Sequence, residues 1–411
     1  MTSIDLDLLL AASRQGGGSC LSSVTELEPA GGEHTSVAPA KFASADKNKK
    51  GGVYAFEQRF LDGILRTVAI IDSKQSQLNR VEEALQLAIE DKHPLLSRVP
   101  RIEVVYRHQG GHEERHYDLT LPHRAYDGHF RAATRDGKPA GELAEYRALR
   151  DATPANARAL LEGSPVTLVF GGWDSMRKAH QSRWRSALVG EIIGFCANDR
   201  VAMRGGARVD PVGMSINLSP KNLVAAAERQ RGEMSGKKID AIAKSAAGGK
   251  GAKKDEPISA SSLVLGGIPP ALNQLAGVAC DRIIRSHVLS MATLRQMRFG
   301  ADAEGNAACR ALLAALALNG LARSDSELRL RANCDLTESG ASEVVLDQRF
   351  GAKLTLDALT IEAADELLEQ ALGYAEKTAR INWKGQVLSL DGDPAIIAGS
   401  VDEEPGEDAD A

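Results

Sequence analysis

The stretch LRTVAIIDSKQSQLNRVEEALQLAIE, residues 65–90, gives the firmest indication of the fold. Its first seven residues are apolar or β-branched except for Arg66, as expected of a buried strand. Ser73 is a preferred helix N-cap residue, and the apolar residues that follow it recur at helical spacing. Residues 65–71 are therefore predicted to form a strand, and residues 74–90 a helix capped by Asp72 and Ser73.

Outward from this unit, the sequence predicts a mixed α/β fold. Further strands are expected at residues 19–27 and 166–170, and a hairpin at residues 101–106 and 115–121 around two glycines. Helices are expected near residues 154–162, 184–195, 280–297, 306–317 and 361–379, and another hairpin at residues 327–331 and 344–350. Residues 198–256 are rich in Gly, Ala, Lys and Arg, which predicts mobile excursions instead of core.

The composition is that of an ordinary soluble protein, with 43% hydrophobic and 26% charged residues. Its five cysteines are an odd number, widely separated and without a Cys-x-x-Cys pair, so we expect reduced thiols and no zinc site. The N-terminus carries acids where a signal peptide would be basic, and the apolar run at residues 8–12 is too short to span a membrane. A cytoplasmic location without a membrane partner is therefore expected.

The net charge of −5 is unevenly distributed along the chain. From Asp391 onward there are acids but no Lys or Arg, which is typical of a solvated, disordered tail. The body is closer to neutral, so a nucleic-acid partner remains compatible with the charge. The expected organisation is an N-terminal segment at residues 1–15, a body at 16–390 with a flexible basic insertion at about 221–256, and an acidic tail at 391–411.

Two stretches resemble catalytic or nucleotide-binding motifs without meeting their requirements. His112 and His116 satisfy the H-E-x-x-H pattern of zinc peptidases, which requires a helix, yet the flanking sequence predicts strands. Two residues four apart are roughly 6 Å apart on a helix but about 13 Å apart on a strand. The stretch GGKGAKK, residues 248–254, lacks the Ser or Thr that follows Lys in a P-loop. No catalytic residue, metal or cofactor is therefore expected.

Polar and basic side chains suited to RNA gather in three other stretches: the start of the helix at residues 74–90, residues 171–186, and residues 200–254. A helix N-terminus binds phosphate, and Arg together with Trp suits single-stranded nucleic acid. The candidate RNA-binding residues are Ser73, Lys74, Gln75, Gln77, Asn79, Arg80, Trp173, Arg177, Arg183, Arg185 and Arg204. The alternatives are a solvated helix face, packing of Trp in the core, and a solubilising basic loop.

Four blocks of sequence, taken in order, resemble the RAMP-type backbone subunit of type I-G (formerly I-U) CRISPR Cascade. They are DSKQSQLNRVE at residues 72–82, LVFGGWDS at 168–175, RSALVGEIIG at 185–194 and GGIPP at 266–270. The resemblance covers residues 16–390, although the segments before Gly266 and at residues 234–254 depart from the family pattern.

This resemblance implies a hand-shaped subunit, namely a modified RRM-like (ferredoxin-like) palm with inserted finger and thumb elements, within an α+β class. It implies head-to-tail polymerisation of copies along CRISPR RNA, contact with other Cascade subunits, recognition of target DNA through the guide, and no catalysis. By position, the helix segment at residues 73–80 matches the element that grips the guide backbone. The thumb would be sought at residues 198–214.

Two alternatives follow from the same residues. The first alternative is a RAMP-family metal-dependent endoribonuclease that uses Asp72 or Asp174. The resemblance suggests it because the backbone subunits of related type III complexes cut RNA with an aspartate and a metal ion. Neither aspartate has a second carboxylate nearby in the sequence to help hold magnesium. The second alternative is a protein scaffold that binds no RNA.

Overall fold

The computed structural model describes residues 3–44, 52–108, 111–247, 256–269 and 274–400. The chain divides into two units. The larger unit comprises residues 1–40, 54–199 and 278–401, and the smaller unit comprises residues 41–53, 200–277 and 402–411. The predicted mixed α/β class is confirmed, because a large antiparallel sheet and several long helices make up the larger unit, consistent with an α+β RRM-like fold.

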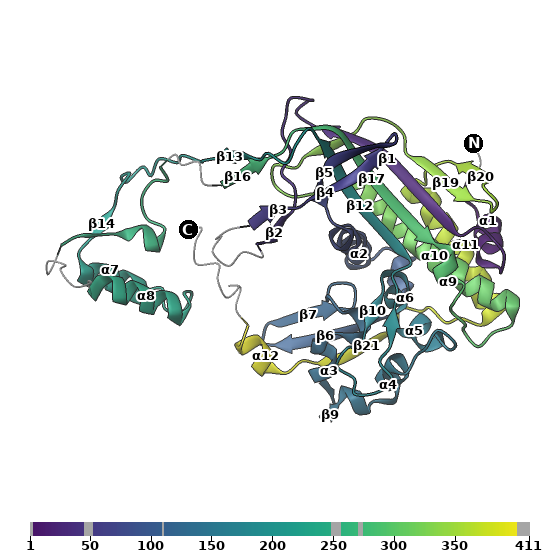
Figure 1. Cartoon of the computed structure of the whole chain (residues 1–411). Helices are drawn as coiled ribbons and strands as arrows, with labels where there is room; N and C mark the ends of the chain where they lie inside the picture. Colours follow the sequence, from purple (N-terminus) through teal and green to yellow (C-terminus); the bar gives the residue numbers. More distant parts are fainter. Residues whose placement is uncertain (1–2, 45–51, 109–110, 248–255, 270–273, 401–411) are drawn as a thin grey trace. The chain divides into compact units, whose positions relative to one another are not determined.

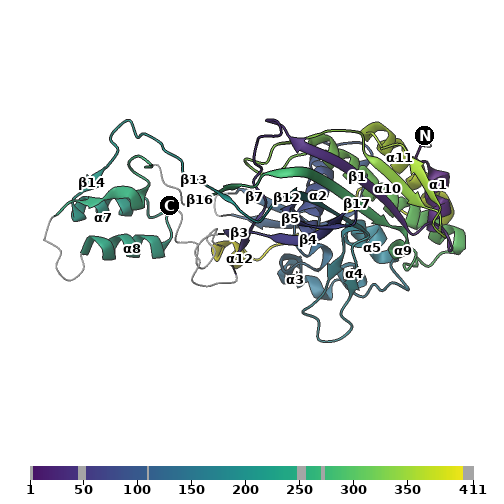
Figure 2. The same cartoon turned by 45° about the horizontal axis from the view of Figure 1, so that its top comes forward.

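The larger unit is built on one antiparallel sheet with the strand order β20-β19-β1-β17-β12-β5-β4, and β18 pairs with β1 beside this path. Figure 2 shows β1, β17, β12 and β5 side by side. The strands are β1 (Cys20–Pro29), β4 (Phe56–Leu61), β5 (Ile64–Asp72), β12 (Leu188–Cys196), β17 (Cys280–Ser290), β18 (Leu336–Glu338), β19 (Glu343–Asp347) and β20 (Lys353–Leu356).

Helices cover one face of this sheet. Along β17, Ile283, Arg285, His287 and Leu289 are buried whereas the residues between them are only half-buried, which is the period-two pattern of a strand with one covered face. The covering helices are α1 (Leu6–Ser13), α2 (Lys74–Glu90), α10 (Ala303–Glu327) and α11 (Ile361–Ala379). In Figure 1, α10 and α11 run together beside the strands. The strand and the capped helix predicted from residues 65–90 are both confirmed, with Ser73 as the N-cap.

Helix α10 is long and apolar enough to cross a membrane by length and composition alone, but 89% of its most apolar window is buried inside the protein. Its apolar residues therefore serve the core. Gly320 lets α10 approach α2 closely, since a Cβ at this position would lie 2.8 Å from Cγ1 of Val81.

A second sheet in the larger unit has the order β7-β6-β21-β8-β9, and β21 runs parallel to β6. The predicted hairpin is confirmed as β6 (Arg101–Arg107) and β7 (Glu113–Tyr117), but its second strand ends at Tyr117, and residues 118–121, predicted to continue it, form no strand. The other strands of this sheet are β8 (Thr134–Arg135), β9 (Lys138–Pro139) and β21 (Val387–Asp391).

The larger unit also contains short helices. They are α3 (Gly128–Ala132), α4 (Ala144–Arg150), α5 (Arg158–Gly163), α6 (Pro165–Phe170), α9 (Met291–Leu294) and α12 (Pro394–Ala398). Its short 3-10 helices are η1 (Leu96–Arg98), η2 (Arg124–Tyr126) and η3 (Ala140–Glu142).

The smaller unit contains two helices and short strand pairs. Helices α7 (Pro220–Glu228) and α8 (Gly236–Ala247) pack together, and η4 (Ala260–Leu263) joins their small buried core. The strand pairs are β2 (Lys41–Ala43) with β3 (Gly52–Tyr54), β13 (Ala202–Arg204) with β16 (Gln274–Gly277), and β14 (Asn217–Leu218) with β15 (Ile258–Ser259). The expectation that no core forms here is wrong for the helices, because Leu223, Ala227 and Ile242 are buried at helical spacing. Residues 248–254 and 401–411 lie outside the described residues.

Several predicted elements have the opposite type. Residues 166–170 belong to helix α6, whose six residues are all buried, and a short apolar run does not distinguish a buried strand from a buried helix. Residues 184–195 and 280–297, predicted as helices, contain the central strands β12 and β17. Of the predicted strand at residues 327–331, Glu327 ends α10 and residues 328–331 form no strand. β19 therefore pairs with β20 and not with this segment.

Candidate nucleic-acid interface

The predicted RNA-binding residues at the start of α2 divide into exposed and internal side chains. Lys74, Gln75 and Asn79 are exposed, whereas Ser73 is half-buried and caps the helix by accepting a hydrogen bond from the Ser76 amide at 3.3 Å. Gln77 is buried, and its amide donates to Asp72 at 2.6 Å. Only some of the side chains predicted to bind RNA at the start of α2 therefore point outward, namely Lys74, Gln75 and Asn79.

Asp72 organises the helix start from inside. Its carboxylate is fully buried and receives Arg80 Nε at 2.9 Å, Ser76 Oγ at 2.9 Å and a hydrogen bond from Arg331. Burial alone would raise the pKa of Asp72, but the hydrogen bonds from Arg80 and Gln77 outweigh it and hold the pKa below its usual value. Arg80 is thus committed to an ion pair that anchors α2, and Asp72 has no side free for a metal ion.

A groove of about 870 Å³ runs along the exposed side of α2. Lys74, Gln75 and Asn79 lie on one wall, and the opposite wall comes from residues 119–122, Arg124, and the ends of α6 and β12. Phe170, Ser186 and Val189 complete this second wall. These wall residues are distant from α2 in the sequence and are brought to it only by the fold.

The exposed charges of the groove differ between its two ends. Lys74 and the positive end of the α2 dipole mark one end, whereas the exposed Glu83 and Glu90 mark the other. Midway, Arg124 forms a bidentate ion pair with the buried Glu82 at 2.5 and 2.6 Å, and burial raises the pKa of Glu82 while this ion pair opposes the rise. A phosphate group therefore fits the end at Lys74, and neutral base or sugar edges fit the other.

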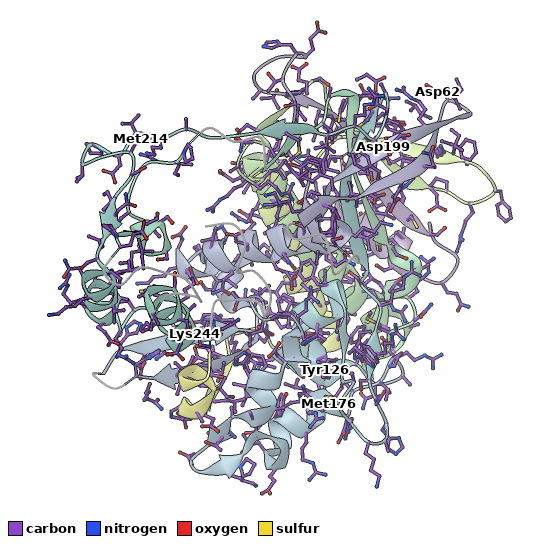
Figure 3. The ribbon with its side chains drawn as sticks, turned by 60° about the vertical axis from the view of Figure 1, so that its left-hand side comes forward. Asp62, Tyr126, Met176, Asp199, Met214 and Lys244 are labelled. Carbon is purple, nitrogen blue, oxygen red and sulfur yellow. The ribbon has the colours of Figure 1, made fainter. Side chains whose placement is uncertain are left out.

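The second predicted cluster forms a short hairpin of β10 (Gly172–Trp173) and β11 (Arg183–Trp184). Trp173 is 49% exposed, and the Arg183 guanidinium stacks on its ring at 5.1 Å from the centroid. Trp184 is buried, and its indole N–H donates to the Tyr126 hydroxyl at 2.7 Å. Figure 3 labels Tyr126 together with Met176, which is 74% exposed on the hairpin loop.

The remaining predicted residues of this hairpin are differently placed. Arg185 is exposed and immediately precedes Ser186 of the groove wall, and the Arg124 guanidinium also donates to the Gly171 carbonyl at 3.2 Å. The hairpin therefore adjoins the groove. Arg177, by contrast, is held by the Arg150 carbonyl at 2.8 Å and by an ion pair with Asp151.

Two further predictions concern other parts of the chain. Arg204 lies on β13 of the smaller unit, and its side chain lies outside the described residues. Asp174, proposed with Asp72 as a metal-binding aspartate of an endoribonuclease, is buried and paired with Arg150 at 2.7 Å. Both aspartates thus have guanidinium partners.

His116 of the H-E-x-x-H match lies on β7 and His112 immediately precedes this strand, as the flanks predicted, so the two histidines do not share a helix face. Glu114 instead forms hydrogen bonds with His108 at 3.0 Å and His116 at 2.7 Å. Both hydrogen bonds lower the pKa of Glu114, and the one with His108 has the larger effect. Over the described parts of the chain, no group of three or more His, Cys, Asp or Glu side chains is placed to hold a metal ion.

Comparison with known proteins adds one match. Residues 21–199 match the family model described as CRISPR-associated protein GSU0053, and this segment contains every residue that lines the groove as well as the β10–β11 hairpin. No curated protein matches the chain. The part of the chain that carries the candidate interface is therefore similar to a CRISPR-associated protein family.

Proposed function

We propose that this protein is a CRISPR RNA-binding backbone subunit of a type I-G Cascade complex. The match at residues 21–199 supports a role in CRISPR defence, and the resemblance of the four sequence blocks supports the finer assignment. In this proposal copies of the chain polymerise head to tail along the guide RNA in the cytoplasm, contact other Cascade subunits, and recognise target DNA through base pairing of the guide. The subunit itself catalyses nothing.

The observation that carries the proposal is the groove along α2. It presents one exposed cation and two exposed amides at the start of a helix, and the hairpin next to it presents an open Trp ring with an Arg on its face. Backbone phosphate binds at such a helix start, and an aromatic ring stacks on unpaired bases of any sequence. A coat protein needs only modest affinity per copy, since neighbouring copies on one RNA reinforce each other.

Nothing in the described residues favours the endoribonuclease. Asp72 and Asp174 are each buried against arginine, and a magnesium ion at either position would have to displace a guanidinium. Incubation of the protein with guide RNA, complementary RNA and magnesium tests this directly. Site-specific cleavage that Asp72→Asn or Asp174→Asn abolishes would replace our proposal with the endoribonuclease.

The experiment for RNA binding compares two matched double variants. Lys74→Ala with Gln75→Ala removes a cation and an amide from the groove, and Lys377→Ala with Gln370→Ala removes the same groups from the exposed side of α11. Affinity for single-stranded RNA is measured by fluorescence anisotropy across a salt series.

We expect only the groove variant to bind more weakly and to reduce the salt slope by about 0.7, the contribution of one phosphate on a single strand. Equal effects of both double variants would remove α2 from the interface. Failure of the wild-type protein to bind RNA at all would favour the protein scaffold.

A further inference from the structure

The larger unit has a second cavity, separate from the groove. It measures about 400 Å³, is partly open to solvent, and is lined by the covered face of the large sheet, α10 and the start of α11. It shares no lining residue with the groove along α2. Most of its wall is apolar, with Leu21, Leu188 and Leu289 from the sheet and Leu318 and Leu321 from α10.

Arg285 on β17 brings a buried guanidinium to this wall. The residue is only 2% exposed, and its Nη2 donates to Glu338 and, at 3.4 Å, to Thr25 Oγ1. Its Nη1 lies 3.5 Å from Asp325 Oδ1, which is an ion pair without a hydrogen bond. Nη1 and Nε therefore remain buried donors that lack an acceptor, a costly arrangement in a protein interior.

His287 adds a buried acceptor two residues further along the same strand. It is 3% exposed, and its Nε2 lies 3.2 Å from Gln77 Oε1. Since the Gln77 amide nitrogen donates to Asp72, the oxygen faces His287, and Nε2 must carry the imidazole proton. The other ring nitrogen, Nδ1, is then a free acceptor without a partner.

The positions of these groups define what would satisfy them. Arg285 and His287 are alternate residues on one face of β17, so their Cα atoms lie about 7 Å apart, and both residues line the cavity. A primary amide between them can accept from the guanidinium and donate to Nδ1 with hydrogen bonds of about 2.9 Å. An anion is disfavoured, because Asp325 and Glu338 together exceed the single positive charge of Arg285.

We propose that this cavity is a binding site for a small, uncharged amphipathic molecule whose amide group lies between Arg285 and His287 and whose apolar part lies among the leucines. The two unpartnered groups orient the ligand, and the leucines supply most of the contact area, as is usual in small-molecule sites. The site is separate from RNA binding and does not depend on it.

The test uses three probes of similar size on the full chain: benzamide, benzoate and toluene. Binding is followed by saturation-transfer NMR and by the shift in Tm, with Leu318→Phe and Leu321→Phe as variants that fill the cavity. We expect benzamide to bind at least tenfold more tightly than benzoate or toluene, and either folded cavity-filling variant to abolish its binding.

Absence of benzamide binding would mean that the cavity holds only water and would overturn the proposal. Toluene binding as tight as benzamide binding would also overturn it, because the polar pair would then play no part. Benzamide binding that persists in both folded cavity-filling variants would place the ligand elsewhere.

Discussion

His287 on β17 is paired directly opposite Gly190 on β12, and its imidazole occupies the space in which any other residue would place a Cβ. A Cβ built on Gly190 would lie 2.0 Å from His287 Cδ2 and 2.7 Å from Nε2. The glycine is therefore required by the close approach of a neighbouring side chain. The same imidazole contacts Gln77, so this glycine is linked to the position of α2.

Gly190→Ala is expected to destabilise the protein by about 1–3 kcal/mol, because the methyl group must displace a buried imidazole. The displaced ring would lose its hydrogen bond to Gln77. Chemical denaturation measures the loss, and Gly141→Ala is the control, since a Cβ at Gly141 would meet nothing within 4 Å. Equal stabilities for the two variants would mean that the ring moves aside at no cost.

Residue types predicted the long helices α2, α10 and α11 but misassigned the centre of the sheet. The segment around Ser73 was predictable because the cap, the apolar spacing and the buried strand all agree. β12 and β17 were not predictable in this way. β12 is a mostly apolar run, which suits a buried helix as well as a buried strand, although its two glycines disfavour a helix. β17 mixes five apolar residues with six polar ones, so its alternation is not evident before the buried Arg285 and His287 are seen. Gly190 and Gly194 lie where neighbouring side chains approach closely, and such a reason is invisible without the partner strand.

Asp72→Asn is expected to destabilise the protein by about 3–5 kcal/mol at neutral pH, since it leaves Arg80 and Arg331 without their counter-charge. The pKa of Asp72 is lowered on folding, so the carboxylate stabilises the folded state above its unfolded pKa of about 4 and loses this effect as the pH falls through the folded value. The gap between wild type and variant should therefore shrink in acid. Urea denaturation from pH 7 to pH 3 measures it.

Asp357→Asn is the control for this series, because Asp357 is exposed. It should leave stability within about 0.5 kcal/mol of wild type at every pH. A gap for Asp72→Asn that stays constant down to pH 3 would contradict the assignment of the acid sensitivity to this carboxylate.

Asp118 should give the stability of the protein the opposite pH dependence. It is fully buried, and burial raises its pKa to about 7 although the Ser164 hydroxyl donates to it at 2.5 Å. The folded state then binds a proton that the unfolded state releases near pH 4, so the free energy of unfolding should fall by a few kcal/mol from about pH 4 to 7. Asp118→Asn should lack this fall, and thermal unfolding across the pH range compares the two.

Ser164→Ala provides a second check on the same carboxyl. Removing the hydroxyl donor should raise the pKa of Asp118 further and extend the loss of stability to higher pH. If Asp118→Asn and wild type have parallel stability curves between pH 4 and 7, the titration belongs to another group.

The candidate interface was predictable only where its residues are consecutive in the sequence. Lys74, Gln75 and Asn79 follow a cap and have no core role, so exposure was a sound inference. Gln77 and Arg80 are polar or basic like these three residues, but their side chains bind the buried Asp72, which nothing in their spacing reveals. The opposite wall of the groove begins at Leu119, which is 29 residues beyond the end of α2 at Glu90, and continues to Val189. Only the fold brings these segments to α2.

Trp173 offers a direct optical test of the hairpin. It is 49% exposed, whereas Trp184 and Trp383 are 5% and 1% exposed and donate their indole N–H to Tyr126 and Leu161. Stacking of an RNA base on Trp173 should therefore quench the fluorescence in a saturable way, and Trp173→Phe should abolish the signal. Trp173→Ala should weaken binding by about 1–3 kcal/mol, the usual contribution of one stacked base.

The matched control places a tryptophan at another exposed position. Phe350 lies fully exposed in the turn between β19 and β20, so Phe350→Trp combined with Trp173→Phe restores an exposed indole away from the hairpin. RNA should leave its fluorescence unchanged. Quenching of this relocated indole would indicate a non-specific effect of RNA. Binding of RNA by anisotropy without quenching in the wild-type protein would exclude the hairpin from the interface. The groove along α2 would then stand or fall by the Lys74→Ala, Gln75→Ala variant alone, because that variant does not touch the hairpin.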